Sequence, residues 1–306
     1  MTQQIHMINQ LSEFRKLVIL AIFSDDELSK LFSLKGGSAL DLIHKITYRS
    51  SMDVDVAMQD DIASEDMIVI EKKLETALQN TFNEYDPPYS IFQFKFEKRP
   101  FKENVKAKKF WGGYRVEFKI RKGIHPIHDL PNPQKAAREA EIINPVSQSK
   151  KFIIDISKYE FTEPSEFKYL EGYSIKVYTL EMIVYEKLRA ICQKLPEYEY
   201  AQEPIKARPK DFYDIYILQK LYGEQLSKDV LWDALVATAK KRETLEQIET
   251  EDIDEVFDEI QSSSVMENLW KAYQRNYSYS ADIPWHTIMK SIRTLYEIIS
   301  ENIHGV

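Results

Sequence analysis

The order of apolar and polar residues predicts that the first half of the chain mixes helices with strands. Apolar residues that recur three or four positions apart predict helices over residues 5–22, 38–45 and 62–82. Runs rich in aromatic and β-branched residues predict strands over residues 90–96, 111–120 and 152–156. Residues 122–148 hold four prolines and predict a loop with one short helix, over residues 134–142. The prediction is an α+β arrangement, with a mixed sheet flanked by helices.

The pattern changes beyond about residue 173, where helical spacing continues with almost no strand signal. The helices predicted there span residues 179–193, 210–222, 227–240, 252–261, 265–277 and 285–303. We place a boundary between residues 160 and 173. The chain is therefore predicted to consist of a mixed-sheet domain, residues 1–165, and an all-helical domain, residues 173–306.

Length and composition indicate a globular protein. The chain has 306 residues, of which 43% are hydrophobic, and can form two modest domains with separate cores. Its single cysteine, Cys192, excludes an intrachain disulfide, and no Cys/His cluster of the zinc-binding kind occurs. Residues 1–10 are polar, and the longest early apolar run, residues 17–23, is too short to cross a bilayer. We therefore predict a cytoplasmic protein with no membrane partner.

The charge of the chain is unevenly distributed. A net charge of -8 argues against a protein that coats nucleic acid indiscriminately. Residues 95–122, however, carry eleven lysines and arginines against three glutamates, with aromatic residues interleaved. A groove that stacks bases and binds phosphates would have this composition, and so would two antiparallel strands with aromatic residues inside and lysines outside. Both interpretations stay open at this point.

The first candidate for chemistry is a pair of glycines, Gly36 and Gly37. Apolar residues at 31–34 predict a buried strand before them, so the glycines are predicted to form a tight turn into the helix at 38–45. At such a turn the backbone N–H groups and the positive end of the helix dipole face an anion, and the Ser38 hydroxyl can contribute. This segment predicts a phosphate-binding site.

A pair of aspartates follows within about one helix length. Asp53 and Asp55 alternate with apolar residues, which is the two-residue period of a strand. Both carboxylates are then predicted on one face, where they repel each other unless a cation lies between them. Hard oxygen ligands suit Mg2+ or Mn2+, which also bind triphosphates and support two-metal nucleotidyl transfer. The sequence therefore predicts a metal site next to a phosphate site.

A strand, a glycine turn, a helix and a strand with paired acids, in this order, resemble the nucleotidyltransferase fold of the polymerase-beta type. In that superfamily a third carboxylate on a later strand completes the metal site and can help to activate the attacking hydroxyl. Asp155 is the preferred candidate because it is the one acid in the apolar run at 152–156, where an unpaired charge is costly to bury. Glu117, on the predicted strand at 114–120, is the rival.

Two helices of the second half each direct a charged residue toward their apolar face. Lys187 lies within the apolar face of its predicted helix. Asp211 lies on the inward side of the next helix, with Asp214 beside it. Such a lysine can snorkel or form a structural ion pair. Alternatively, Lys187 and Asp211 hold a triphosphate and its counter-charge at a cleft between the two domains.

Four segments together resemble the AbiEii/AbiGii nucleotidyltransferase toxin family, in the order of the family. They are residues 35–40, 49–55, 185–190 and 208–214. The resemblance implies an N-terminal nucleotidyltransferase fold followed by a helical domain. It also implies a toxin of a bacterial toxin–antitoxin or abortive-infection pair, with a cognate antitoxin encoded nearby. Some members of the family transfer nucleotides from an NTP to the 3′ end of tRNA, which blocks aminoacylation.

The resemblance implies roles for individual residues as well. By motif position, the nucleotide-binding residues are Lys35, Gly36, Gly37, Ser38, Arg49, Ser51 and Lys187. By the same positions Asp53 and Asp55 are metal ligands, with Asp155 as the preferred third ligand, and the catalytic set adds Lys187 and Asp211 to these three. Ser50 departs from the family pattern, in which an aromatic or apolar residue is usual between the arginine and the serine.

The predicted reaction is transfer of a nucleotide from an NTP that is bound with Mg2+ or Mn2+. An acceptor hydroxyl attacks the α-phosphate and pyrophosphate leaves, while the protein positions the reactants and neutralises charge. The basic residues at 95–122 favour a polyanionic acceptor, which the resemblance makes the 3′ end of tRNA. The alternatives are nucleotidylation of a protein or small molecule, and a non-catalytic module that binds nucleotide or a partner protein.

Overall fold

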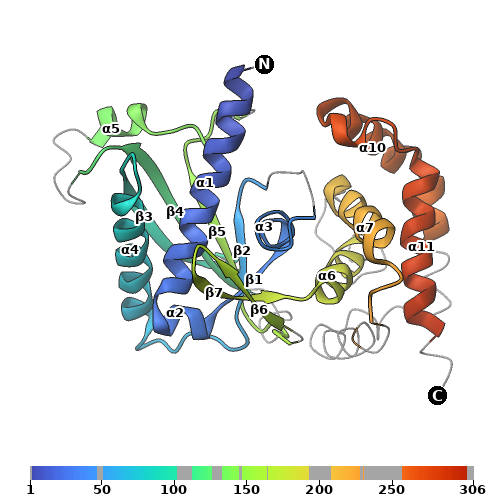
Figure 1. The fold of residues 1–306 in the computed structure, drawn as a ribbon, viewed down its shortest axis with the longest axis horizontal. Helices are drawn as coiled ribbons and strands as arrows, with labels where there is room; N and C mark the ends of the chain where they lie inside the picture. Colours follow the sequence, from blue (N-terminus) through green and yellow to red (C-terminus); the bar gives the residue numbers. More distant parts are fainter. Residues whose placement is uncertain are drawn as a thin grey trace. The chain divides into compact units, whose positions relative to one another are not determined.

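The computed structural model describes residues 2–46, 51–101, 112–125, 133–144, 147–163, 165–192, 208–227, 230 and 257–301 (Figure 1). The chain groups into two compact units, which we describe separately. The first comprises residues 1–45 and 49–178, and the second comprises residues 46–48 and 179–306. In the described part of the chain, no helix is both long enough and apolar enough to cross a bilayer.

The first unit is built on a mixed seven-stranded sheet with the strand order β3-β4-β5-β2-β1-β7-β6. The strands are β1 (Ser33–Lys35), β2 (Val54–Ala57), β3 (Tyr89–Arg99), β4 (Gly113–Lys122), β5 (Phe152–Ser157), β6 (Ser165–Leu170) and β7 (Tyr173–Tyr178). β2 runs parallel to β5 and antiparallel to β1, and β1 runs parallel to β7. The strands predicted from aromatic and β-branched runs are confirmed as β3, β4 and β5.

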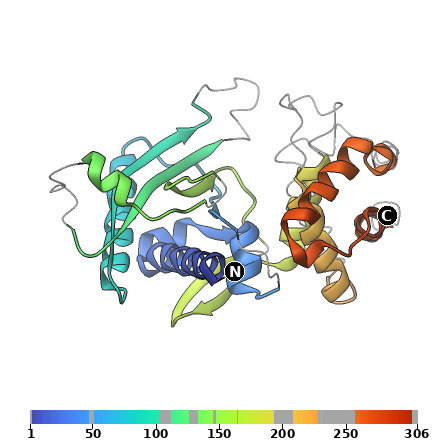
Figure 2. The same cartoon turned by 90° about the horizontal axis from the view of Figure 1, so that it is seen from above.

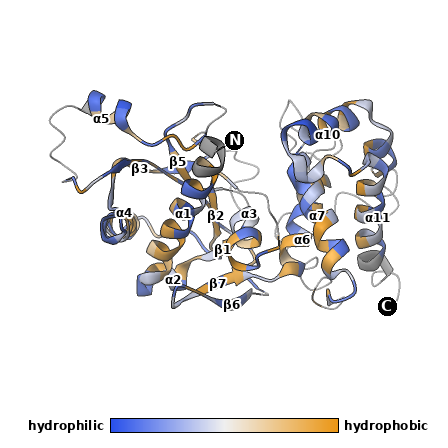
Figure 3. Cartoon of the chain, turned by 45° about the horizontal axis from the view of Figure 1, so that its top comes forward, coloured by the Kyte–Doolittle hydropathy of each residue, from blue (hydrophilic) through white to orange (hydrophobic). Residues whose placement is uncertain are grey.

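Two helices, α1 (Thr2–Ser24) and α4 (Met67–Glu84), pack against one face of this sheet. The short helix α2 (Asp26–Leu31) packs on both of them. α1 and α4 lie side by side beneath the strands in the view from above (Figure 2). Buried apolar side chains follow one another along α4 at four-residue intervals: Ile70, Leu74, Leu78 and Phe82. The outer side of α4 is hydrophilic (Figure 3), so burial of its apolar stripe holds α4 in place.

The predicted helices of the first half are confirmed with shifted ends. The helix predicted over residues 5–22 is α1, and the short helix predicted over residues 134–142 is α5 (Pro133–Glu139). The helix predicted over residues 62–82 begins later, at Met67, because residues 64–66 form a turn before it.

The strand β4 shows the pattern of the second interpretation of the basic stretch, that of paired antiparallel strands. Its even-numbered residues 114–120 are buried, while Arg115, Glu117 and Lys119 between them are partly exposed. Phe118 stacks on Phe152 of β5 inside the core, with ring centroids 5.3 Å apart. In β4 the aromatic residues therefore lie inside and the charged residues outside, as expected for paired antiparallel strands. Residues 102–111 lie outside the described part of the chain.

The strands β6 and β7 are not among the predicted elements. They form an antiparallel hairpin whose turn contains Glu171 and Gly172, both with positive φ. β7 covers residues 173–178, where the helical domain is predicted to begin, and it groups with the first unit. β6 gives a weak sequence signal because it lies at the sheet edge, where Phe167 and Tyr169 are exposed and no apolar face is buried.

The second unit is helical in its described residues. Its elements are α6 (Leu180–Cys192), α7 (Pro209–Tyr222), α10 (Ser264–Asn276), η2 (Ser278–Ser280) and α11 (Trp285–Glu301). Most of the helix predicted over 227–240 and the first half of that over 252–261 lie outside the described residues. α7 packs on α11 through Phe212 and Trp285, whose ring centroids are 5.4 Å apart. The predicted α+β class, a mixed sheet with helices followed by a helical region, is confirmed.

Candidate active site

The predicted tight turn is confirmed where β1 ends and a helix begins. Residues 36–43 are helical, as α3 (Gly36–Ser38) and the π-helical turn η1 (Ala39–Ile43). Gly36 has a φ of +69°, and a Cβ atom on it would lie 2.4 Å from Oδ2 of Asp55. Only glycine combines this backbone conformation with so close an approach. The turn is therefore held directly against an acid on β2.

Three carboxylates meet on the face of the sheet opposite to the buried valines of β2 and the buried isoleucines of β5. Asp55 pairs in register with Asp155 across the parallel strands, and Asp53 lies one residue before β2. One oxygen atom from each side chain lies within 4.8 Å of the other two, and all three residues are half-buried. Hard oxygen donors of this number and spacing fit a divalent cation such as Mg2+ or Mn2+.

Two serines fix the segment that carries Asp53. Ser51 Oγ donates a hydrogen bond to Oδ1 of Asp53 at 2.7 Å, and Ser38 Oγ donates to the Asp53 backbone carbonyl at 2.8 Å. Ser38 thereby ties the glycine helix to the acidic segment, and contact of its hydroxyl with a phosphate stays a prediction. Of the other predicted nucleotide-binding residues, Gly37 is buried in α3 and Arg49 lies outside the described residues.

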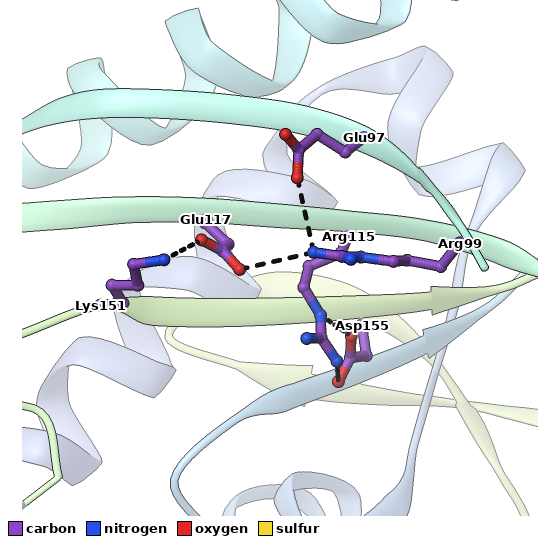
Figure 4. A network of polar contacts seen from close by, with 6 residues as sticks. All are labelled: Glu97, Arg99, Arg115, Glu117, Lys151 and Asp155. Atoms are coloured by element: carbon purple, nitrogen blue, oxygen red, sulfur yellow. Dashed lines mark hydrogen bonds and ion pairs between the residues drawn. The ribbon is translucent and has the colours of Figure 1, made fainter. Parts of the chain in front are cut away.

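Arg115 of β4 neutralises Asp155 from the neighbouring strand. The two residues pair in register, and Arg115 Nε and Nη2 donate to the two carboxylate oxygens of Asp155 at 2.7 and 3.2 Å (Figure 4). These hydrogen bonds raise the pKa of the Arg115 guanidinium. The sequence alone assigns Arg115 no individual role. The available signal is the strand period, which places Arg115 on the same face as Glu117.

Glu117, the rival third carboxylate, belongs to a different group of contacts. Its Oε2 accepts a hydrogen bond from Lys151 Nζ at 2.7 Å, and its Oε1 lies 3.7 Å from Nη2 of Arg99, which also donates to Glu97 (Figure 4). The bond from Lys151 lowers the pKa of the Glu117 carboxyl. The structure thus brings Asp155, and not Glu117, together with the other two aspartates.

Lys35, predicted to bind the nucleotide, lies opposite Asp55 in register. Its Nζ is 3.5 Å from Oε1 of Glu160 and 6.0 Å from the centroid of the Tyr178 ring. Glu160 is fully buried, where a charge is costly unless a cation pairs with it. Lys35 therefore has a structural partner next to the acidic site. Glu160 escapes prediction because its irregular segment has no periodic pattern.

In the second unit, Lys187 of α6 forms ion pairs with two aspartates of α7. Its Nζ lies 2.7 Å from Oδ2 of Asp214 and 3.2 Å from Oδ1 of Asp211. Arg208 Nε adds a contact to Asp211 at 2.9 Å, and the lysine and both aspartates are buried. The structural ion pair considered from the sequence is confirmed, and triphosphate binding by Lys187 and Asp211 stays a prediction.

Comparison with known proteins adds a family to this geometry. The family model described as nucleotidyl transferase AbiEii toxin, type IV TA system, matches residues 18–297. The chain belongs to this family. The resemblance inferred from the four sequence segments is thereby confirmed, and this AbiEii-family protein is a nucleotidyltransferase of the toxin type. A comparison with curated proteins finds no match.

Solved structures of similar proteins cover nearly the whole AbiEii-family chain. JHP933 from Helicobacter pylori has 17% sequence identity to it and a TM-score of 0.48, over 97% of this chain and 96% of that one. MenT4, a nucleotidyltransferase toxin from Mycobacterium tuberculosis, has 12% identity and a TM-score of 0.42, over 96% of this chain and 93% of that one.

Proposed function

We propose that this protein transfers a nucleotide from an NTP, with Mg2+ or Mn2+, to the 3′ end of tRNA, and that a cognate antitoxin restrains it. The observation that carries the proposal is the group formed by Asp53, Asp55 and Asp155 beside Gly36. Like charges whose oxygens lie within 4.8 Å of one another favour a bound cation. The adjoining turn would offer backbone N–H groups to the phosphates that accompany such a cation.

The proposed roles follow from the positions of the residues. Asp53, Asp55 and Asp155 would hold the metal, which when bound neutralises the triphosphate and polarises its α-phosphate. Backbone N–H groups at Gly36 would bind phosphate oxygens, and Ser51 keeps the Asp53 carboxylate oriented. A carboxylate oxygen of Asp155 would accept the proton of the attacking hydroxyl. Pyrophosphate is the leaving group.

Lys187 and Asp211 enter the proposal through the family motifs that they occupy. A lysine with Asp214 as a close counter-charge can bind a phosphate by exchanging its longer contact, to Asp211, for a phosphate oxygen. Lys35 would contribute a second cation in the same way, because it lies opposite Asp55 in register.

The choice of tRNA as the acceptor is the most specific part of the proposal. It is supported by the cations of the basic stretch, which on β4 alternate with buried residues as Arg115, Lys119 and Arg121 on the partly exposed face. A polyanionic acceptor suits this face better than a small neutral molecule does.

Incubation with each labelled NTP, Mg2+ and total tRNA tests the proposal. We expect the wild type to label the tRNA 3′ end and Asp53→Ala to abolish labelling and growth inhibition while the protein stays folded. Glu117→Gln removes a carboxylate from the same face and should retain labelling. Full transfer by Asp53→Ala would contradict the assignment. Binding of nucleotide without incorporation would favour the non-catalytic module, and label in protein would move the acceptor away from RNA.

A further inference from the structure

Arg115 places a positive charge beside the proposed metal ligands. Two of its nitrogens bond to both oxygens of Asp155, and the side chain is 32% exposed. The charge of Asp53 also acts on the Arg115 guanidinium, so Arg115 interacts electrostatically with more than its direct partner. A divalent cation held by the three aspartates would lie next to this guanidinium.

The neighbouring charges on the same face pair among themselves. Lys151 and Arg99 bond to or flank Glu117, and Arg99 also bonds to Glu97, in the network of Figure 4. Arg115 is thus the cation of this network that bonds to an aspartate of the proposed metal site, whereas Lys151 lies on the other side of Glu117 from Asp155 (Figure 4). Arg115 and Lys151 can therefore be compared by experiment. Each donates hydrogen bonds to one carboxylate, and of the two only Arg115 donates to Asp155.

We propose that Arg115 is a built-in counter-cation of the metal site, a positioning residue that holds Asp155 in the metal-free protein and with which a divalent cation must compete for that carboxylate. The inference rests on the proposed metal site and adds to it the residue that sets metal affinity. Metal binding would break the bidentate contact to Asp155, and the guanidinium N–H groups would then be released toward the phosphates that arrive with the metal.

A second account of Arg115, in which it only orients Asp155, predicts the opposite change in metal affinity when Arg115 is removed. If the guanidinium fork merely orients Asp155, its loss leaves the carboxylate disordered and metal affinity falls. If Arg115 competes, its loss removes a repulsive charge and frees both oxygens, so metal affinity rises. For a partly exposed cation next to a divalent ion, we expect the gain to be on the order of tenfold.

Titration of Mn2+ into the NTP-free full-length protein separates the two accounts. The variants are Arg115→Gln, which retains a hydrogen-bond donor without the charge, and Lys151→Gln as the matched control. We expect Arg115→Gln to bind Mn2+ about tenfold more tightly than the wild type, and Lys151→Gln to stay within about threefold of it. Without metal, Arg115→Gln should also melt at a lower temperature than the wild type, and Mn2+ should raise its melting temperature more.

Equal or weaker Mn2+ binding by Arg115→Gln, or an equal gain in Lys151→Gln, would overturn the inference. No Mn2+ binding by either the wild type or Arg115→Gln, or binding that Asp53→Ala leaves unchanged, would instead overturn the metal site itself and the inference with it.

A measurement on the wild type covers the case in which Arg115→Gln does not fold. The Nε–H resonance of Arg115, identified by its loss in Arg115→Lys, should shift on addition of Mg2+ to the position of a guanidinium without a carboxylate partner. A resonance that does not move while Mg2+ binds would overturn the inference.

Discussion

The two units each hold a cluster of charged residues, and the two clusters are neutralised in different ways. In the second unit Lys187 lies between Asp211 and Asp214, Arg208 adds a second cation, and the lysine and both aspartates are buried. In the first unit three half-buried carboxylates share one face, and Arg115 bonds to one of them.

The difference predicts how each cluster responds to the loss of one of its members. In the second unit the charges of one lysine, one arginine and two acids cancel. Removing one member therefore leaves a buried charge without a counter-charge. In the first unit three acids lie on a partly exposed face, where solvent and ions can reach them. Removing one of them should therefore change the stability of the fold little and weaken the binding of a cation. The predictions below test this contrast, from the largest expected effect to the smallest.

Lys187→Met should reduce the free energy of unfolding by about 3–5 kcal/mol, because it leaves Asp211 and Asp214 buried without their shared cation. Urea unfolding of the full chain measures the change. Lys220→Met, on the exposed side of α7, serves as the control and should cost less than about 1 kcal/mol. A loss below about 1 kcal/mol for Lys187→Met would contradict the contrast between the clusters.

Gly36→Ala should destabilise the first unit by about 1–3 kcal/mol, since its Cβ would collide with the Asp55 carboxylate at a positive φ. Gly172→Ala is the matched control, because Gly172 also has a positive φ but nothing lies within 4 Å of its added Cβ. The excess of the first change over the second isolates the contact with Asp55. Equal effects in urea unfolding would show that the contact is unimportant.

Asp155→Asn should weaken Mn2+ binding on the order of tenfold, because it removes one of three charged ligands. Its effect on the free energy of unfolding should stay within about 1 kcal/mol, since the ion pair with Arg115 is partly exposed. Calorimetric titration and urea unfolding give the two numbers. Glu117→Gln should leave the affinity unchanged, and a weakening as large as that of Asp155→Asn would reverse the choice of third ligand.

The contact between Lys151 and Glu117 should give a small dependence of stability on pH. The hydrogen bond from Lys151 lowers the pKa of Glu117 in the folded protein, so its contribution is complete above the unfolded pKa and disappears as the pH falls through the lowered value. Lys151→Gln should therefore lose less than about 1 kcal/mol at pH 7 and nothing measurable below both pKa values. Urea unfolding at a series of pH values from pH 7 downward would detect the decrease, and a loss that stays the same throughout the series would contradict it.

Much of the fold follows from patterns of apolar residues. The stripe along α4 and the buried alternate residues of β4 are visible in the sequence because each element covers one face of a single core. β6 escapes prediction because its exposed aromatic residues, Phe167 and Tyr169, cover no core. The start of α4 at Met67 likewise depends on a local turn that periodicity does not reveal.

The candidate site divides in the same way. Asp53 and Asp55 can be found because they alternate with apolar residues where a strand begins, and Gly36 because a glycine pair precedes a helix. The partners of Asp155 and Lys35 cannot be found in this way. Arg115 meets Asp155 through strand register, and Glu160 meets Lys35 through a loop that returns to the sheet. Register depends on the packing of the whole sheet, which a local pattern does not contain.

Incorporation of a labelled nucleotide by Asp55→Asn tests the central claim most directly. Asparagine keeps the shape that fits against Gly36 but lacks the charge that binds a divalent cation. With saturating Mg2+, NTP and tRNA, we predict transfer at least about a hundredfold slower than that of the wild type, at an unchanged melting temperature. Transfer at the wild-type rate would contradict the claim that these aspartates bind the catalytic metal.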